Sequence, residues 1–122
     1  MPTTEIHEHD FVAEGLLLTD VRGSLPRRVL STAGMIAMME YAATTLAMSH
    51  IPPGTTTVGF EVCVKHVAAA PEGAHCVARA VLREVVEERR LRFHVEVAAG
   101  DSTIGVGTHE RRVVPAAGVR NF

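Results

Sequence analysis

The sequence predicts an α+β fold in which an antiparallel five-stranded sheet wraps around one long apolar helix. The stretch from Ser31 to His50 contains almost no polar side chain, which is typical of a helix buried on most sides. Five other segments alternate apolar and polar residues with the two-residue period of strands. Short turns join the last four of these segments, and successive hairpins imply antiparallel pairing.

Length, charge and cysteine content limit the class of protein. With 122 residues, the chain is expected to form a single domain over residues 1–122. The net charge of -2 gives no reason to expect a nucleic-acid partner. We expect no membrane span, because Glu40 interrupts the best apolar run. The first ten residues lack a signal-peptide core, and Cys63 and Cys76 are expected to be buried free thiols, so a cytoplasmic location is predicted.

The first predicted elements are a strand, a loop and the helix. The strand covers residues 5–18, and the Gly- and Pro-containing loop over residues 19–29 carries three arginines, Arg22, Arg27 and Arg28. Ser31 or Thr32 is expected to cap the helix, because either hydroxyl can accept a hydrogen bond from a free backbone N–H. The helix is expected to end near His50, where the sequence IPPG cannot continue it.

Four strands are predicted after the helix, over residues 55–67, 75–88, 90–98 and 103–114, followed by an irregular tail over residues 115–122. In the first of these strands, strict alternation predicts one face made of Val58, Phe60, Val62, Val64 and His66, with Gly59 on the other face. One sheet and one wholly apolar helix indicate that the sheet curls around the helix, which is the hot-dog arrangement. A helix packed on a flat sheet is the alternative.

Glu40 is the candidate functional residue that stands out first. It lies in the middle of the most apolar segment of the chain. An unpaired buried carboxylate is costly, so such a group is normally paired, protonated or used in chemistry. The structural alternative is a carboxylate tied to a partner or facing out through a gap in the sheet.

Three sequence segments together resemble the hot-dog thioesterases of the fluoroacetyl-CoA thioesterase family. They are STAGMIAMMEYA at the start of the helix, V-x-V-K-H-x-A-A-x-P-x-G over residues 62–73, and G-x-G-T-H-E-R over residues 105–111. The resemblance runs from about Val29 to Val114. It implies a homodimer with active sites along the subunit interface, and hydrolysis of an acyl-CoA thioester.

The same resemblance implies a set of site residues. Thr32, Glu40 and His66 match the family's catalytic threonine, glutamate and histidine, Gly59 matches a pocket-lining glycine, and Arg111 matches the family's arginine, expected to contact the CoA moiety. No cofactor is implied, because coenzyme A is part of the substrate.

Thioester hydrolysis requires a nucleophile or a base that activates water, and Glu40 can serve as either. His66 can move protons near neutral pH, although a lone histidine on an apolar face is more often structural. The hydroxyl of Thr32 can bond the carboxylate or the acyl group, or it can simply cap the helix. Gly59 can relieve crowding or allow substrate to approach the backbone.

No metal site is expected. His7 and His9 share a strand face and lie beside Asp10, but the sequence offers no third ligand at a suitable spacing.

The chain departs from the family ahead of the helix. Fluoroacetyl-specific enzymes carry phenylalanines there that cover the acyl group, whereas residues 23–28 read GSLPRR and contain no aromatic residue. We therefore expect a thioesterase for a short or medium acyl chain; the missing aromatic residues argue against selectivity for a fluorinated acyl group, and the sequence leaves the identity of the acyl group open. A hot-dog module that binds an acyl-CoA or another small ligand without catalysis is the alternative, and a hydratase ranks last because its aspartate–histidine pattern is missing.

Overall fold

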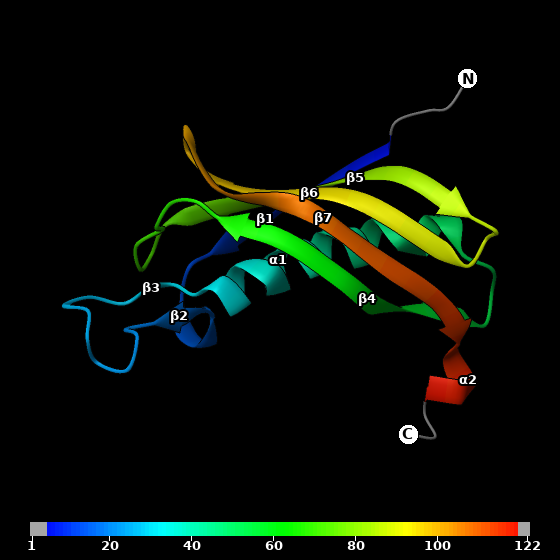
Figure 1. Ribbon diagram of the computed structural model, residues 1–122, viewed down its shortest axis with the longest axis horizontal. Coiled ribbons are helices and arrows are strands. Elements are labelled where there is room, and N and C mark those ends of the chain that lie inside the picture. The colour runs from blue at the N-terminus through cyan, green and yellow to red at the C-terminus, as the bar shows by residue number, and fades with distance from the viewer. Residues whose placement is uncertain (1–4, 120–122) are drawn as a thin grey trace.

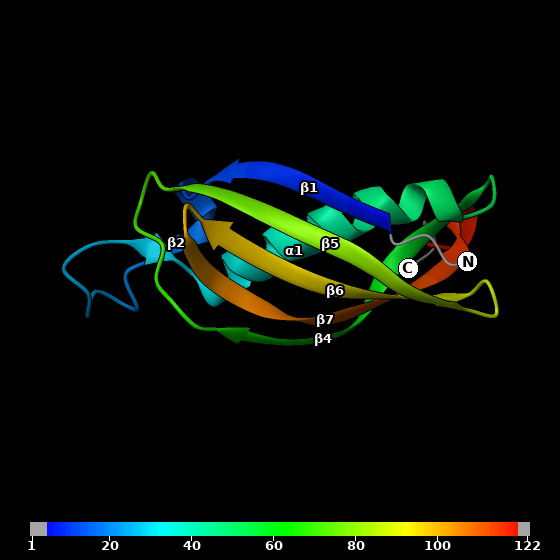
Figure 2. The same cartoon turned by 90° about the horizontal axis from the view of Figure 1, so that it is seen from above.

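In the computed structural model, which describes residues 5–119, an antiparallel sheet curves around one long helix, α1 (Figure 1). The sheet has five strands in the order β1-β5-β6-β7-β4, so β1 and β4 are its edges (Figure 2). The strands are β1 (Glu5–Val12), β4 (Thr55–His66), β5 (His75–Val86), β6 (Arg90–Ala99) and β7 (Ser102–Pro115). The predicted α+β arrangement is therefore confirmed.

The helix α1 (Thr32–Ala47) begins and ends close to where its sequence signals predict. Ser31 is the N-cap, because its Oγ accepts a hydrogen bond of 2.8 Å from the backbone N–H of Gly34. A 3-10 turn, η2 (Met48–His50), continues α1 to the predicted end. The cap therefore occupies Ser31 and leaves the Thr32 side chain for another contact.

One side of α1 packs against the sheet, and a second stripe of the helix remains outside the core. The buried side consists of Met35, Met38, Met39, Ala42, Ala43, Leu46 and Ala47. A Cβ added to Gly105 of β7 would lie 2.2 Å from Met35 Sδ, so this glycine lets α1 approach the sheet closely. The other stripe is exposed or half-buried and consists of Ala33, Ile36, Ala37, Glu40, Tyr41 and Thr44. The expectation of a helix buried on most sides is wrong for this stripe.

A β-bulge in β4 corrects the predicted faces of that strand. Gly59 pairs with Arg111 of β7 and Glu61 pairs with Glu110, so Phe60 is an extra residue between them. An extra residue reverses the alternation of side chains along a strand. Gly59 consequently faces α1, on the same side as His66, whereas Phe60 lies on the outer face beneath Arg112 and is 58% exposed.

Several smaller expectations also change. The first predicted strand ends at Val12. Its second half forms a 3-10 turn, η1 (Gly15–Leu17), and the start of β2 (Leu18–Thr19), which pairs with β3 (Val29–Leu30) after the predicted loop. In the predicted irregular tail, Ala116–Val119 form a helical turn, α2, while residues 120–122 lie outside the described residues.

Both cysteines are free, but only one of them is buried. Cys76 lies in the core, and its burial raises the pKa of the thiol, whereas Cys63 is exposed on the edge strand β4. The expectation of a buried thiol is therefore wrong for Cys63.

Within residues 5–119, no helix has the length and apolar character that crossing a membrane requires.

Candidate active site

Glu40 lies at the middle of α1, on the stripe that the sheet does not cover. Its Oε2 is 3.5 Å from Arg111 Nη1 and 3.9 Å from His109 Nε2. Its side chain is 40% exposed, so the expectation of a carboxylate buried inside one chain is wrong. The carboxylate instead sits at an open side of the molecule, with a cation fixed behind it.

Arg111 of β7 is held by hydrogen bonds on all three of its nitrogen atoms. Its Nε donates to Thr57 Oγ1 at 2.8 Å, Nη2 donates to the Thr57 carbonyl at 3.0 Å, and Nη1 donates to His109 Nε2 at 3.2 Å. Burial lowers the pKa of Arg111, and the Glu40 carboxylate opposes that shift. An arginine remains charged at neutral pH, so the cluster presents an immobilised cation to Glu40.

His109 determines how one side of Arg111 is held. Its Nδ1 lies 2.8 Å from the carbonyl oxygen of Glu61, and since a carbonyl only accepts, Nδ1 must carry the proton. Its Nε2 is then free to accept from Arg111. Burial is the main cause that lowers the pKa of His109, the Arg111 charge lowers it too, and the bond to Glu61 partly offsets both. The imidazole is therefore neutral at pH 7. We call Glu40, Thr57, His109 and Arg111 the Arg111 cluster.

Thr32 and His66 form a second polar group at the start of α1. Thr32 Oγ1 lies 2.9 Å from His66 Nδ1. The other ring nitrogen, His66 Nε2, is buried and has no hydrogen-bond partner within residues 5–119. A pocket of about 370 Å³ surrounds this Thr32–His66 pair and is also lined by Leu30, Val67, Ala68 and Ala69. A buried nitrogen without a partner is costly, so Nε2 is suited to bind a group that enters this pocket.

The chain therefore brings the predicted site residues together in two groups rather than one. Gly59 adjoins the Arg111 cluster, because a Cβ added to it would lie 2.8 Å from Glu40 Oε2. Glu40 follows Thr32 by eight helical residues, which corresponds to about 12 Å along the axis. A single chain thus holds Glu40, Gly59 and Arg111 at one place and Thr32 with His66 at another.

Two residues of the Arg111 cluster were missed by the reading of the sequence. His109 lies two residues before Arg111, and this spacing on a strand places both on one face. The motif G-x-G-T-H-E-R contained that signal. Thr57 offered no signal, because its position beside Arg111 depends on the pairing of β4 with β7.

The described residues hold no group of three side chains suited to a metal ion. His9 instead packs beside Phe11 and Tyr41, with ring centroids 4.9 Å and 4.5 Å apart.

A family model described as fluoroacetyl-CoA-specific thioesterase matches residues 9–117. A fluoroacetyl-CoA thioesterase from Streptantibioticus cattleyicolor is 40% identical over 86 residues, which cover 70% of this chain and 61% of that protein. The chain thus spans under two thirds of that relative in the alignment.

Solved structures of fluoroacetyl-CoA thioesterase superpose over nearly the whole chain. One has 32% identity and a TM-score of 0.85, covering 99% of this chain and 93% of that one. A variant in complex with acetyl-CoA has 31% identity and a TM-score of 0.87, covering 99% and 95%. A thioesterase superfamily member from Thermus thermophilus, at 23% identity and a TM-score of 0.85 over 98% and 88%, shares the fold.

Proposed function

This chain belongs to the fluoroacetyl-CoA-specific thioesterase family, and we propose that it hydrolyses the thioester of a short or medium acyl-CoA. The observation that supports this best is the Glu40 carboxylate, which is 40% exposed and lies 3.5 Å from the immobilised Arg111 guanidinium. The glycine at position 59 makes room for this carboxylate, because a Cβ there would lie 2.8 Å from Glu40 Oε2.

The proposed chemistry assigns a role to each polar group. Glu40 takes a proton from water, whose oxygen adds to the thioester carbonyl carbon. The carbon–sulfur bond then breaks, and the departing thiolate takes a proton from His66, while the proton on Glu40 returns to His66 through solvent. Thr32 orients His66 through their 2.9 Å contact. Direct attack by Glu40, with an anhydride intermediate, is the alternative route.

The acyl group is proposed to be short or medium and not restricted to fluoroacetyl. The segment between β2 and β3 forms exposed turns and contains no aromatic side chain that could cover an acyl group. Fluoroacetate with CoA, and acetyl-CoA, are bound in two of the related solved structures. A fluorinated acyl group is expected here to have no advantage over its unfluorinated equivalent.

A homodimer is proposed to join the two polar groups into one site. The edge strand β4 has twelve residues and exposes apolar side chains, including Phe60 and Val62, beside the open stripe of α1. A long, apolar, unpaired edge strand is a surface that pairs readily with another strand. A second copy related by a two-fold axis would extend the sheet antiparallel through β4.

The sequence of β4 favours a particular register for this pairing. With the two-fold axis at Cys63, Glu61 of one copy lies opposite Lys65 of the second copy, and opposite charges stabilise a cross-strand pair. The bulge at Gly59 and Phe60 then lies opposite His66 of the second copy. Glu40 of one chain would thereby face the Thr32–His66 pair of the other.

Two measurements test the dimer and its register. Light scattering should give twice the monomer mass, and mild oxidation should link two chains through Cys63, with Cys63→Ser as the control that abolishes the link. Mixing inactive Glu40→Gln with inactive His66→Ala should restore activity, because a mixed dimer contains one intact site. A monomer, or mixtures that stay inactive, would refute the composite site.

Thiol release from a panel of acyl-CoAs, acetyl to decanoyl with fluoroacetyl and aryl members, tests the activity itself. We expect Glu40→Gln to lose turnover by roughly a thousandfold or more. Glu96→Gln is the control: it removes the same negative charge at a half-buried carboxylate outside both polar groups, and it should retain wild-type turnover. Wild-type turnover in both Glu40→Gln and His66→Ala would eliminate the proposal.

The alternative is a module that binds an acyl-CoA without hydrolysing it, which retention of ligand with no released thiol would favour.

Single turnover in ¹⁸O-labelled water separates the two catalytic routes, because only an anhydride intermediate can place the label in Glu40. The expectations of no nucleic-acid partner and of a cytoplasmic location stay predictions from the sequence.

A further inference from the structure

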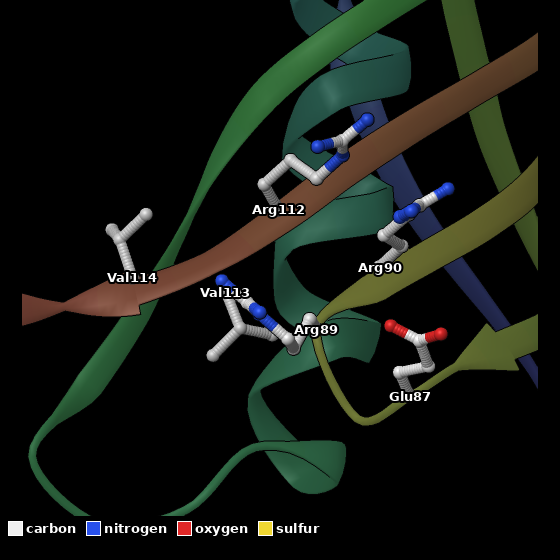
Figure 3. A pocket seen from close by; sticks show the side chains of 6 residues that line it. All are labelled: Glu87, Arg89, Arg90, Arg112, Val113 and Val114. Atoms are coloured by element: carbon white, nitrogen blue, oxygen red, sulfur yellow. The ribbon is translucent and has the colours of Figure 1, made fainter.

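A pocket lined by arginines lies at the turn between β5 and β6, away from the Thr32–His66 pair. It measures about 320 Å³ and is lined by Glu87, Arg89, Arg90, Arg112, Val113 and Val114 (Figure 3). We call this the arginine pocket. It contains three cations and one carboxylate, and neither polar group of the candidate active site lines it.

The positive charge of the arginine pocket is not balanced by the protein. Arg90 of β6 and Arg112 of β7 are directly paired across the sheet, and like charges at such positions destabilise it. Arg112 has a partner in Glu110, with Nε 2.7 Å from Oε2. Neither Arg89 nor Arg90 forms an ion pair within residues 5–119. The pocket is therefore suited to an anion.

A second arginine-containing pocket provides an internal comparison. It lies beside the loop ahead of α1 and is lined by Arg27 and Arg28, together with Asp20 and Glu72. Arg28 Nη2 is 2.8 Å from Glu72 Oε2, and the lining of this pocket contains two carboxylates and two arginines. Both pockets contain arginines, so the presence of arginine does not separate them. They differ in the charge of their lining residues, because arginines outnumber carboxylates only in the arginine pocket.

The turn that carries Arg89 and Arg90 is also strained. Glu87 and Glu88 adopt φ of 55° and 57°, in the left-handed region that glycine or asparagine normally occupies in such a hairpin turn. The turn is closed by a bond from Arg89 N to the Val86 carbonyl, and the Arg89 carbonyl accepts from Val113 N at 2.8 Å.

We propose that the arginine pocket binds phosphate groups at the nucleotide end of an acyl-CoA, which rests on the proposed thioesterase function. Phosphates are the anionic groups of that substrate, and arginine binds them through paired N–H donors. Arg112 is pre-oriented for this role, because Phe60 stacks 3.5 Å beneath its guanidinium and Glu110 holds its Nε. Arg89 and Arg90 form no ion pair within residues 5–119, and Glu87 is the single carboxylate among the lining residues.

Kinetics of Arg90→Gln with three thioesters of the same acyl group test this assignment. With acyl-CoA, KM should rise by about tenfold, the effect of one lost charged hydrogen bond, at unchanged kcat. With the acyl-pantetheine thioester, which has no nucleotide, KM should equal that of the wild type. With acyl-3′-dephospho-CoA, the KM increase shows whether the 3′-phosphate or the diphosphate is bound.

The control is Arg83→Gln, which removes the same charge from an exposed position on β5 outside the pocket. Its KM for acyl-CoA should change by less than about twofold, the range of surface charge effects. An equal rise of KM in both variants, or a rise for acyl-pantetheine in Arg90→Gln, would overturn the assignment.

Direct titration with adenosine 3′-phosphate 5′-diphosphate separates this inference from the proposed activity, because it requires no turnover. Binding to the wild type should weaken by about tenfold in Arg90→Gln and remain in Glu40→Gln. Inorganic phosphate should compete weakly. Equal binding by wild type and Arg90→Gln would overturn the inference even if the protein hydrolyses acyl-CoAs, whereas differential binding would uphold it in a protein that hydrolyses none.

Discussion

The Arg111 cluster and the Thr32–His66 pair differ in how completely their polar atoms are satisfied. In the cluster, Arg111 is 7% exposed and bonded through each of its nitrogens, and His109 is 3% exposed with both ring nitrogens in contact. The pair has a single mutual contact, and His66 Nε2 has no partner within residues 5–119. One group is complete within the chain, and the other lacks a component.

This difference indicates how a divided site can be built. A buried polar network that is fully bonded holds its members rigidly, so the chain alone can position Glu40. A partly buried pair with an unsatisfied nitrogen is suited to receive a substrate or a second chain. Substitutions in the cluster should therefore reduce stability as well as activity, whereas substitutions in the pair should reduce activity alone.

His66→Ala is expected to cause the largest loss of turnover. If the variant also lost stability, the contrast between the two polar groups would be wrong. Loss of a general acid lowers turnover by about 10²–10⁴-fold. The free energy of unfolding should change by less than about 1 kcal/mol, because the residue is only half-buried and bonds one hydroxyl. Turnover on acyl-CoA and urea unfolding of the same preparation measure the two quantities. A loss of several kcal/mol would assign His66 a structural role.

Arg111→Gln should reduce both quantities. Removing the guanidinium leaves Thr57 and His109 with unsatisfied buried acceptors, which costs about 2–4 kcal/mol of unfolding free energy. Turnover should also fall, since Glu40 loses its cation. Arg79→Gln, at a surface ion pair with Glu8, is the matched control and should change stability by under about 1 kcal/mol. If urea unfolding gave Arg111→Gln the same stability as the wild type, the hydrogen bonds of Arg111 would not hold the cluster together.

Gly59→Ala, which adjoins the Arg111 cluster, should change the position of the Glu40 carboxylate with little effect on stability. The added Cβ would lie 2.8 Å from Glu40 Oε2, the end of a flexible side chain that can rotate away. We expect turnover to fall by roughly 10–100-fold through the displaced carboxylate, because small misplacements of reacting groups are costly. Thermal unfolding should change by only a few degrees. Unaltered turnover would show that Glu40 needs no fixed position.

The smallest expected effect is a pH dependence that His109 contributes to stability. The unfolded chain binds a proton at this histidine near pH 6.5, whereas burial lowers its pKa in the fold. The unfolded state then holds more protons below that pH, so stability falls as the pH decreases through 6.5. His109→Phe should weaken this dependence, so the difference in unfolding free energy between wild type and variant should shrink as the pH falls from 8 to 5.5. Urea unfolding at both pH values measures it; parallel curves would contradict the assignment.

Much of the fold could be predicted from local pattern. The apolar run and its serine cap predicted α1 nearly to the residue, because helix formation depends on neighbours three and four positions apart. In β6 the apolar residues alternate with polar ones as the two-residue period of a strand requires, and the four on the inner face, Leu91, Phe93, Val95 and Val97, are all buried. The family resemblance also named residues that the chain does bring together, namely Thr32 with His66 and Gly59 with Glu40 and Arg111.

The sequence by itself determined the elements, the hot-dog arrangement and the family, since these depend on local periodicity and on motif residues. Only the tertiary structure decided that a bulge turns Gly59 toward Glu40, that Thr57 and His109 hold Arg111, and that Glu40 is half exposed. The physical reason is that these features depend on how β4 pairs with β7, strands separated by two others along the chain. The spacing within β7 places His109 and Arg111 on one face, but nothing in either strand reveals the register between β4 and β7, and a one-residue shift in that register reverses which side chains meet.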